Sequence, residues 1–386
     1  MRKRTLGVVA GLAASSLLVA ACSSSSDSGS SASASASESA SASESASEES
    51  SAPAAEGKVG VILPDAASSA RWETADRPFL EQAFQAAGVE YDIQNANGDK
   101  AKFATIADQM LASGVSVLMI VNLDSDSGAT VIQKAADQGV PTIDYDRLTL
   151  GGGASYYVSF DNVAVGSTMG EGLVACMQAN GNDSGPVALL NGSPTDNNAT
   201  LFKQGYEQVI TDAGYTIAAD QSVPDWDNTK AGTIFEQMYT KANGDFVGVN
   251  SANDGLGGAV ITVLEKNGQA GKIPVTGQDA TDEGLQRVLL GTQCVTVYKA
   301  VKKEADAAAQ LAIDLINGDT AAADAMASAT VEDTTTGEQV PSVLLEPQGI
   351  GPEQVKDVIA DGFTTYDRVC TTDAIKKKCE EYGVTP

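Results

Sequence analysis

Short apolar runs alternate with helical patterns from about Lys58 onward, and this alternation constrains the fold more than any other feature. Stretches such as 77–88 and 102–114 carry apolar residues at i, i+3 and i+4 and end in a glycine, which is typical of a helix and its C-cap. Regular alternation of strands and helices predicts parallel sheets that are covered by helices and buried on both faces. The predicted strands are 59–63, 91–96, 117–122, 141–146, 156–161, 187–192, 215–220, 246–250, 273–279 and 294–299.

These strands form two similar series, one before and one after residue 162. A chain of 386 residues is long enough for two globular bodies with substantial cores. The pattern therefore predicts an α/β protein with two similar lobes.

The N-terminus is typical of an export signal. Three basic residues at positions 2–4 precede an apolar segment, and residues 19–22 read Val-Ala-Ala-Cys, like a bacterial lipobox. We expect a signal peptide over residues 1–21 and a lipid anchor on Cys22. Residues 22–56 are almost all Ser, Ala and Glu, so we interpret them as a disordered tether.

The charge balance excludes several functions. The chain has 51 acidic and 24 basic residues, a net charge of −27, which argues against nucleic acid as a partner. It contains no histidine, so it cannot use a Ser-His-Asp triad or a His-ligated zinc site. We predict no catalytic residues, no metal and no cofactor.

Four further cysteines remain, namely Cys176, Cys294, Cys370 and Cys379. In an exported protein an even number favours disulfides, and four cysteines allow three pairings. The short spacing of Cys370 and Cys379 favours a small loop, which would leave Cys176 and Cys294 to pair with each other.

Polar side chains follow nearly every predicted strand. In a parallel sheet the carboxyl ends of the strands meet at one edge, where open α/β proteins bind their ligands. The adjacent Asp146 and Arg147 are an example, because they interrupt a buried strand with two opposite charges. Acidic acceptors and basic donors suit the hydroxyl groups of a sugar, and a Trp face suits its C–H groups. For each residue alone, a helix N-cap, a solvated ion pair or a core position is an alternative interpretation.

These residues lie in segments that resemble the sugar-binding proteins of ABC transporters, particularly the D-xylose-binding and multiple-sugar-binding proteins. The resemblance runs from about Gly57 to Thr365 and includes SARW, YDRL, YYVSFDN, GSPTDNNA, TGQDA, GTQ…TVYK and VPSVLLEP, in that order. In PDAASSARW, small residues stand where xylose-binding proteins have a second basic residue, and this segment looks more like the multiple-sugar binders.

The resemblance implies a set of sugar-binding residues in both lobes. Trp226 would stack on the sugar ring, and Trp72 would form a second aromatic wall. The polar residues would be Arg71, Asp146 and Arg147 from the N-terminal lobe, Asp196 and Asn198 from the C-terminal lobe, and Asn253, Asp279 and Lys299 to complete the shell.

The resemblance also implies the type I periplasmic binding fold, with two Rossmann-like lobes joined by a three-strand hinge. We expect the chain to cross the hinge near 161–162, 299–301 and 340–342. The expected N-terminal lobe is 57–161 plus 300–340, the C-terminal lobe is 162–299 plus 341–365, and a tail covers 366–386.

The function implied is capture of a monosaccharide and its delivery to an ABC permease at the outer face of the bacterial cell membrane. D-xylose is the first expectation, with glucose, galactose and arabinose as alternatives, and a monomer is expected. A sugar sensor or chemoreceptor partner would use the same site. A carboxylate glycosidase is disfavoured because basic residues flank the acids, and a DNA-binding regulator because the chain lacks a helix-turn-helix and carries an export signal.

Overall fold

The computed structural model describes residues 57–386. The expected signal peptide, the lipid-anchored Cys22 and the tether over 22–56 lie outside the described residues.

The first lobe is built on a seven-stranded sheet with the order β11-β12-β5-β4-β3-β1-β2. All neighbouring strands are parallel except β11 and β12. The predicted strands of this lobe are confirmed, although the sequence did not predict β11 and β12. The bounds are β1 (Lys58–Leu63), β2 (Glu90–Asn95), β3 (Val117–Ile120), β4 (Thr142–Tyr145), β5 (Tyr156–Phe160), β11 (Ala329–Glu332) and β12 (Gln339–Leu345).

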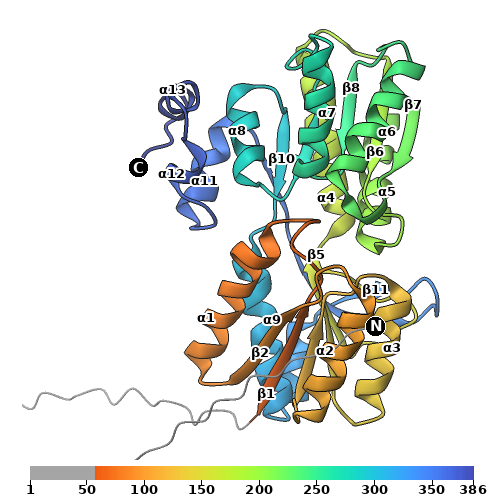
Figure 1. Cartoon of the computed structure of the whole chain (residues 1–386), viewed down its shortest axis with the longest axis vertical. Helices are drawn as coiled ribbons and strands as arrows, with labels where there is room; N and C mark the ends of the chain where they lie inside the picture. Colours follow the sequence, from red (N-terminus) through yellow and green to blue (C-terminus); the bar gives the residue numbers. More distant parts are fainter. Residues whose placement is uncertain (1–56) are drawn as a thin grey trace, which may run out of the picture. The chain divides into compact units, whose positions relative to one another are not determined.

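Helices cover both faces of this sheet (Figure 1). Val61 of β1 packs with α1 and α9, whereas its neighbour Ile62 packs with α2 and α3 on the opposite face. Successive side chains of a strand point to opposite faces, so a sheet buried on both faces needs apolar residues at consecutive positions. The helices are η1 (Trp72–Asp76), α1 (Arg77–Ala87), α2 (Lys100–Ala112), α3 (Ser125–Ala136), α9 (Val301–Ile316) and α10 (Thr320–Met326).

The second lobe contains two three-stranded sheets, with the orders β7-β6-β8 and β13-β10-β9. One isolated bridge between Val249 and Val275 connects them. The predicted strands are again confirmed, while β13 and the division of the sheet were not predicted. The strands are β6 (Pro186–Asn191), β7 (Thr216–Ser222), β8 (Gly248–Ser251), β9 (Thr276–Gln278), β10 (Val295–Tyr298) and β13 (Gln348–Ile350). The helices are α4 (Asn162–Ala179), α5 (Asn197–Asp212), η2 (Pro224–Trp226), α6 (Asn228–Lys241), α7 (Asp254–Lys266) and α8 (Asp282–Leu290).

The chain passes between the two lobes between β5 and α4, between β10 and α9, and after β12. The third passage differs from the expected position near 340–342. Strand β12 remains paired with β5 as far as Leu345, so residues 341–345 belong to the sheet of the first lobe. The apolar residues of β12 extend this sheet by one more parallel strand before the chain leaves it.

The C-terminal tail folds against the second lobe. Its helices are α12 (Tyr366–Val369) and α13 (Asp373–Glu381), and η3 (Pro352–Gln354) and α11 (Val355–Ala360) precede it. Val369, Ile375 and Cys379 form a core with residues of α8 and β10. Arg368 also forms an ion pair with Asp282, with 2.8 Å between Nε and Oδ2.

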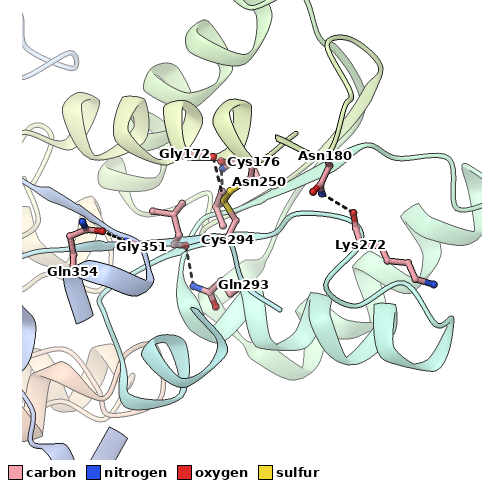
Figure 2. Close-up of a disulfide and its surroundings, with 11 residues drawn as sticks. Gly172, Cys176, Asn180, Asn250, Lys272, Gln293, Cys294, Gly351 and Gln354 are labelled. Carbon is pink, nitrogen blue, oxygen red and sulfur yellow. Dashed lines mark hydrogen bonds between the residues drawn. A yellow bond between two sulfur atoms is a disulfide. The ribbon is translucent and has the colours of Figure 1, made fainter. Parts of the chain in front are cut away.

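Two disulfides connect the cysteine pairs favoured by their spacing, Cys176–Cys294 and Cys370–Cys379. Figure 2 shows the first, which joins α4 to the residue before β10. Nearby, Asn180 donates a hydrogen bond from Nδ2 to the carbonyl oxygen of Lys272 at 3.2 Å. These contacts join the C-terminal half of α4 to the segments that lead into β9 and β10.

The two disulfides should differ in their contribution to stability. Loss of loop-closure entropy predicts about 5 kcal/mol for Cys176–Cys294, which spans 118 residues, and about 3 kcal/mol for Cys370–Cys379, which spans 9. We expect urea unfolding of the two double Cys→Ser variants to show the larger loss of unfolding free energy for the first pair. Equal losses would contradict the loop-length argument.

Candidate functional site

The ten residues predicted to bind ligand all line one cavity between the two lobes. The space between its atoms is about 320 Å³ with the adjoining solvent included, of which about 30 Å³ can hold the centre of a water molecule. Each residue lies in the loop or the first helical turn that follows a strand, because the carboxyl ends of both sets of strands face this point. The ten are Arg71, Trp72, Asp146, Arg147, Asp196, Asn198, Trp226, Asn253, Asp279 and Lys299.

Four lining residues were missed, namely Ser68, Ser69, Phe202 and Gln278. The two serines lie in the same loop after β1 as Arg71, and Gln278 directly precedes Asp279, so the strand-end rule could have included them. Phe202 lies four residues after Asn198 on α5, on the same side of that helix.

A network of buried hydrogen bonds holds the turn after β4. Asp144 accepts hydrogen bonds from the backbone N–H and the hydroxyl of Thr149, at 2.6 and 2.7 Å. Asn122 donates to the same hydroxyl at 2.8 Å. Burial raises the pKa of Asp144 to about 7. This network fixes the turn in which Asp146 adopts a left-handed backbone with φ of 62°.

Asp146 lies among three cations. Its Oδ2 is 2.9 Å from Nη1 of Arg71 and 3.7 Å from Nζ of Lys299. Burial alone would raise the pKa of Asp146, but the charges of Lys299, Arg71 and Arg147 outweigh burial and lower it. The carboxylate is therefore ionised at neutral pH and can accept hydrogen bonds.

Contacts across the cavity join the two lobes. Asn198 donates from Nδ2 to the carbonyl oxygen of Asp146 at 2.8 Å, and Arg147 pairs with Asp196 at 3.0 Å. On the opposite side, the hydroxyl of Ser69 donates to Asp279 at 3.1 Å. The cavity therefore combines three cations with three carboxylates, contributed by both lobes.

Aromatic rings form the apolar part of the wall. Trp72 donates from Nε1 to the hydroxyl of Ser68 at 3.2 Å, and Trp226 donates from Nε1 to Asp196 at 3.1 Å. The ring of Phe202 meets that of Trp226 edge to face, with centroids 6.5 Å apart. A Cβ atom on Gly192 would lie 2.0 Å from the Trp226 ring, so this position requires glycine. The hydrogen bonds and packing hold both indole rings in place.

Arg71 has further partners behind the cavity that sequence reasoning missed. Its guanidinium contacts both oxygens of Asp76, at 2.9 and 2.7 Å, and Oε2 of Glu304 at 2.6 Å. Burial lowers the pKa of Arg71, but the three carboxylates Asp76, Asp146 and Glu304 outweigh burial and raise it. Asp76 is the last residue of η1 and Glu304 lies in the first turn of α9, and neither lines the cavity, so the polar residues chosen at the strand ends did not include them.

Residues 57–386 lack two further features. Within this range, no group of three or more His, Cys, Asp or Glu side chains is placed to hold a metal ion. No helix there has the length and apolarity that a membrane span requires.

The fold and the position of the cavity agree with those of a known protein family. The periplasmic binding protein domain matches residues 59–320, which is more than half of the chain. The chain belongs to the periplasmic binding protein family. Its members bind ligands and are not enzymes.

Within this family the chain is similar to sugar-binding proteins. It is 33% identical over 318 residues to the D-xylose-binding periplasmic protein of Escherichia coli, covering 81% of this chain and 92% of that protein. It is 30% identical to the multiple sugar-binding periplasmic receptor ChvE of Rhizobium radiobacter, covering 80% and 91%. A carbohydrate transporter solute-binding protein from Chloroflexus aurantiacus, solved with D-glucose, superposes with a TM-score of 0.72 at 26% identity, covering 80% and 97%.

The contribution of this hydrogen-bond network to stability can be measured with a substitution at Thr149. Thr149→Val keeps the shape of the side chain but removes the hydroxyl, so that Asp144 and Asn122 each lose one buried hydrogen bond. Asp144 keeps its bond from the backbone N–H of Thr149, and Asn122 keeps its bond to the carbonyl oxygen of Arg147. We expect a loss of about 1–3 kcal/mol in unfolding free energy at pH 7, measured by urea unfolding. Thr130→Val is the control, since its hydroxyl bonds only an exposed carbonyl of α3. Equal effects of the two variants would contradict this role of Thr149.

Proposed function

We propose that this protein binds a monosaccharide in the cavity between its lobes and delivers it to an ABC importer. The observation that carries the proposal is the convergence of the ten strand-end residues on one buried cavity. D-xylose is the first candidate, since the D-xylose-binding protein of Escherichia coli is 33% identical over most of both chains. Glucose remains a candidate because the Chloroflexus protein, of similar fold, was solved with it.

The chemistry of the cavity suits a neutral polyhydroxylated ligand. Asp146, Asp196 and Asp279 can accept hydrogen bonds from hydroxyl groups, while Arg71, Arg147 and Lys299 can donate to their oxygens. The rings of Trp72, Phe202 and Trp226 offer apolar faces to the C–H groups of a sugar. Because positive and negative side chains are equal in number, the lining does not favour an anion or a cation.

Binding should depend strongly on Asp146. Replacing it by alanine would leave hydroxyl groups of the bound sugar without an acceptor. We expect Asp146→Ala to weaken binding at least about tenfold, equivalent to 1.4 kcal/mol. Calorimetric titration with D-xylose, D-glucose, D-galactose and L-arabinose measures this effect.

Asp108→Ala is the matched control for this experiment. It removes a carboxylate of the same lobe from an exposed ion pair with Lys134, and exposed pairs contribute little. It should bind like the wild type. If none of the four sugars binds to the wild type, the proposed function is wrong. If Asp146→Ala melts earlier but binds normally, Asp146 is only structural.

We place the protein outside the cytoplasm, held to the membrane by lipid on Cys22. The proposal rests on the lipobox-like residues 19–22 and the apolar segment before them. Cys22→Ser should move the protein from the membrane fraction to the soluble extracytoplasmic fraction of a bacterial host. Labelled fatty acid on that variant would refute the anchor.

A further inference from the structure

Glu304 is a buried carboxylate that does not line the cavity. It lies in the first turn of α9, shortly after Lys299 and the passage between the lobes, and its solvent exposure is 0%. Its Oε2 accepts a hydrogen bond from Nη2 of Arg71 at 2.6 Å. Among the described residues, its other oxygen, Oε1, has no hydrogen-bond partner.

Arg71 connects Glu304 to the cavity. Its Nε and Nη2 contact Asp76, and Nη2 also contacts Glu304, so these contacts lie behind the cavity. Nη1 contacts Asp146, which lines the cavity. A change in the interaction between the guanidinium and Glu304 would therefore alter the contact between Nη1 and Asp146.

The charges around Arg71 are not balanced. The three cations and three carboxylates of the cavity already compensate one another, and Asp76 and Glu304 add two more buried acids. A buried carboxylate without a full compensating charge is costly, and the lowest-cost state is often the protonated one. Charged or titratable groups facing Glu304 are Arg71, Asp76, Tyr145, Asp146, Tyr157 and Lys299.

Glu304 is the acid that holds a proton. Burial is the main cause that raises its pKa to about 8; the charge of Arg71 opposes this, and those of Asp146 and Asp76 add to it. At pH 7 the side chain is therefore mostly neutral. At pH 9 it is mostly ionised and shares the positive charge of the guanidinium with Asp146, although the two carboxylates contact different nitrogens.

We propose that Glu304 is a positioning residue for sugar binding: while it is neutral it leaves the charge of Arg71 to Asp76 and Asp146, and when it ionises it weakens the contact between Arg71 and Asp146. This inference rests on the proposed function, because it assigns Asp146 and Arg71 to the sugar site. It implies that sugar affinity falls as the pH rises from 7 to 9.

Two variants of α9 separate this effect from general alkaline effects. Glu304→Gln keeps the length of the side chain and an oxygen for Nη2 of Arg71, but it cannot ionise. Asp306→Asn makes the same carboxylate-to-amide change on the exposed face of α9, where Asp306 pairs with Lys302 and is 47% exposed. All other titrating groups are unchanged in both.

The experiment is calorimetric titration of the three proteins with D-xylose and D-glucose at pH 7 and pH 9. We expect wild type and Asp306→Asn to bind at least about fivefold more weakly at pH 9, the low end of typical coupling between sites. Glu304→Gln should bind with nearly the same affinity at both pH values. Identical pH profiles for wild type and Glu304→Gln, or a flat wild-type profile, overturn the inference but not the proposed function. If the wild type binds neither these nor related sugars, both are wrong.

Unfolding without sugar provides a second readout. Between the usual Glu range and about pH 8, the folded protein retains the Glu304 proton that the unfolded chain has lost. Stability should therefore fall as the pH rises through this window, and the fall should be smaller in Glu304→Gln. If Glu304→Gln changes this stability profile but binds sugar with the wild-type pH profile, Glu304 is only structural and the inference is overturned.

Discussion

Compensation between buried charges is the interaction on which this structure depends. A charged side chain removed from water costs several kcal/mol unless an opposite charge and hydrogen bonds replace the solvent. Here Asp146 and Arg147 follow β4 and Lys299 follows β10, far away in the sequence, yet each lies beside a charge of opposite sign. Because Arg147 pairs with Asp196 and Lys299 lies 3.7 Å from Asp146, the same contacts also join the two lobes. The site and the relation between the lobes therefore have one physical basis.

The sequence could not decide whether a polar residue after a strand caps a helix or faces a ligand, and the structure shows that one residue does both. Asn253 accepts a hydrogen bond from the backbone N–H of Leu256 through Oδ1, which caps α7. Its Nδ2 donates to the carbonyl oxygen of Ser68 at 3.4 Å, on the wall of the cavity. A helix begins where its strand ends in this fold, so both requirements fall on the same few positions.

Periodicity and the strand-end rule predicted strands β1 to β10 and the position of the cavity, but not β11 and β12. They did not predict β13, which has three residues, or the passage after Leu345, since neither changes the local pattern. They also missed Glu304, which the sequence places among lysines and alanines as on an ordinary solvated helix. Only its contact with Arg71, 233 residues earlier, makes it a buried acid. Partners of that kind belong to the tertiary structure and leave no local signal.

The distances around Lys299 and Arg71 suggest how charged groups can serve a neutral ligand. Behind the cavity, Arg71 is held by short contacts of 2.7 Å to Asp76 and 2.6 Å to Glu304. Lys299 lies 3.7 Å from Asp146 and 3.4 Å from Asp279, beyond the usual length of a charged hydrogen bond. A hydroxyl group can accept from Lys299 and donate to either carboxylate without breaking a short ion pair. The tight contacts fix the geometry in advance, and the loose ones leave hydrogen-bonding capacity for the ligand.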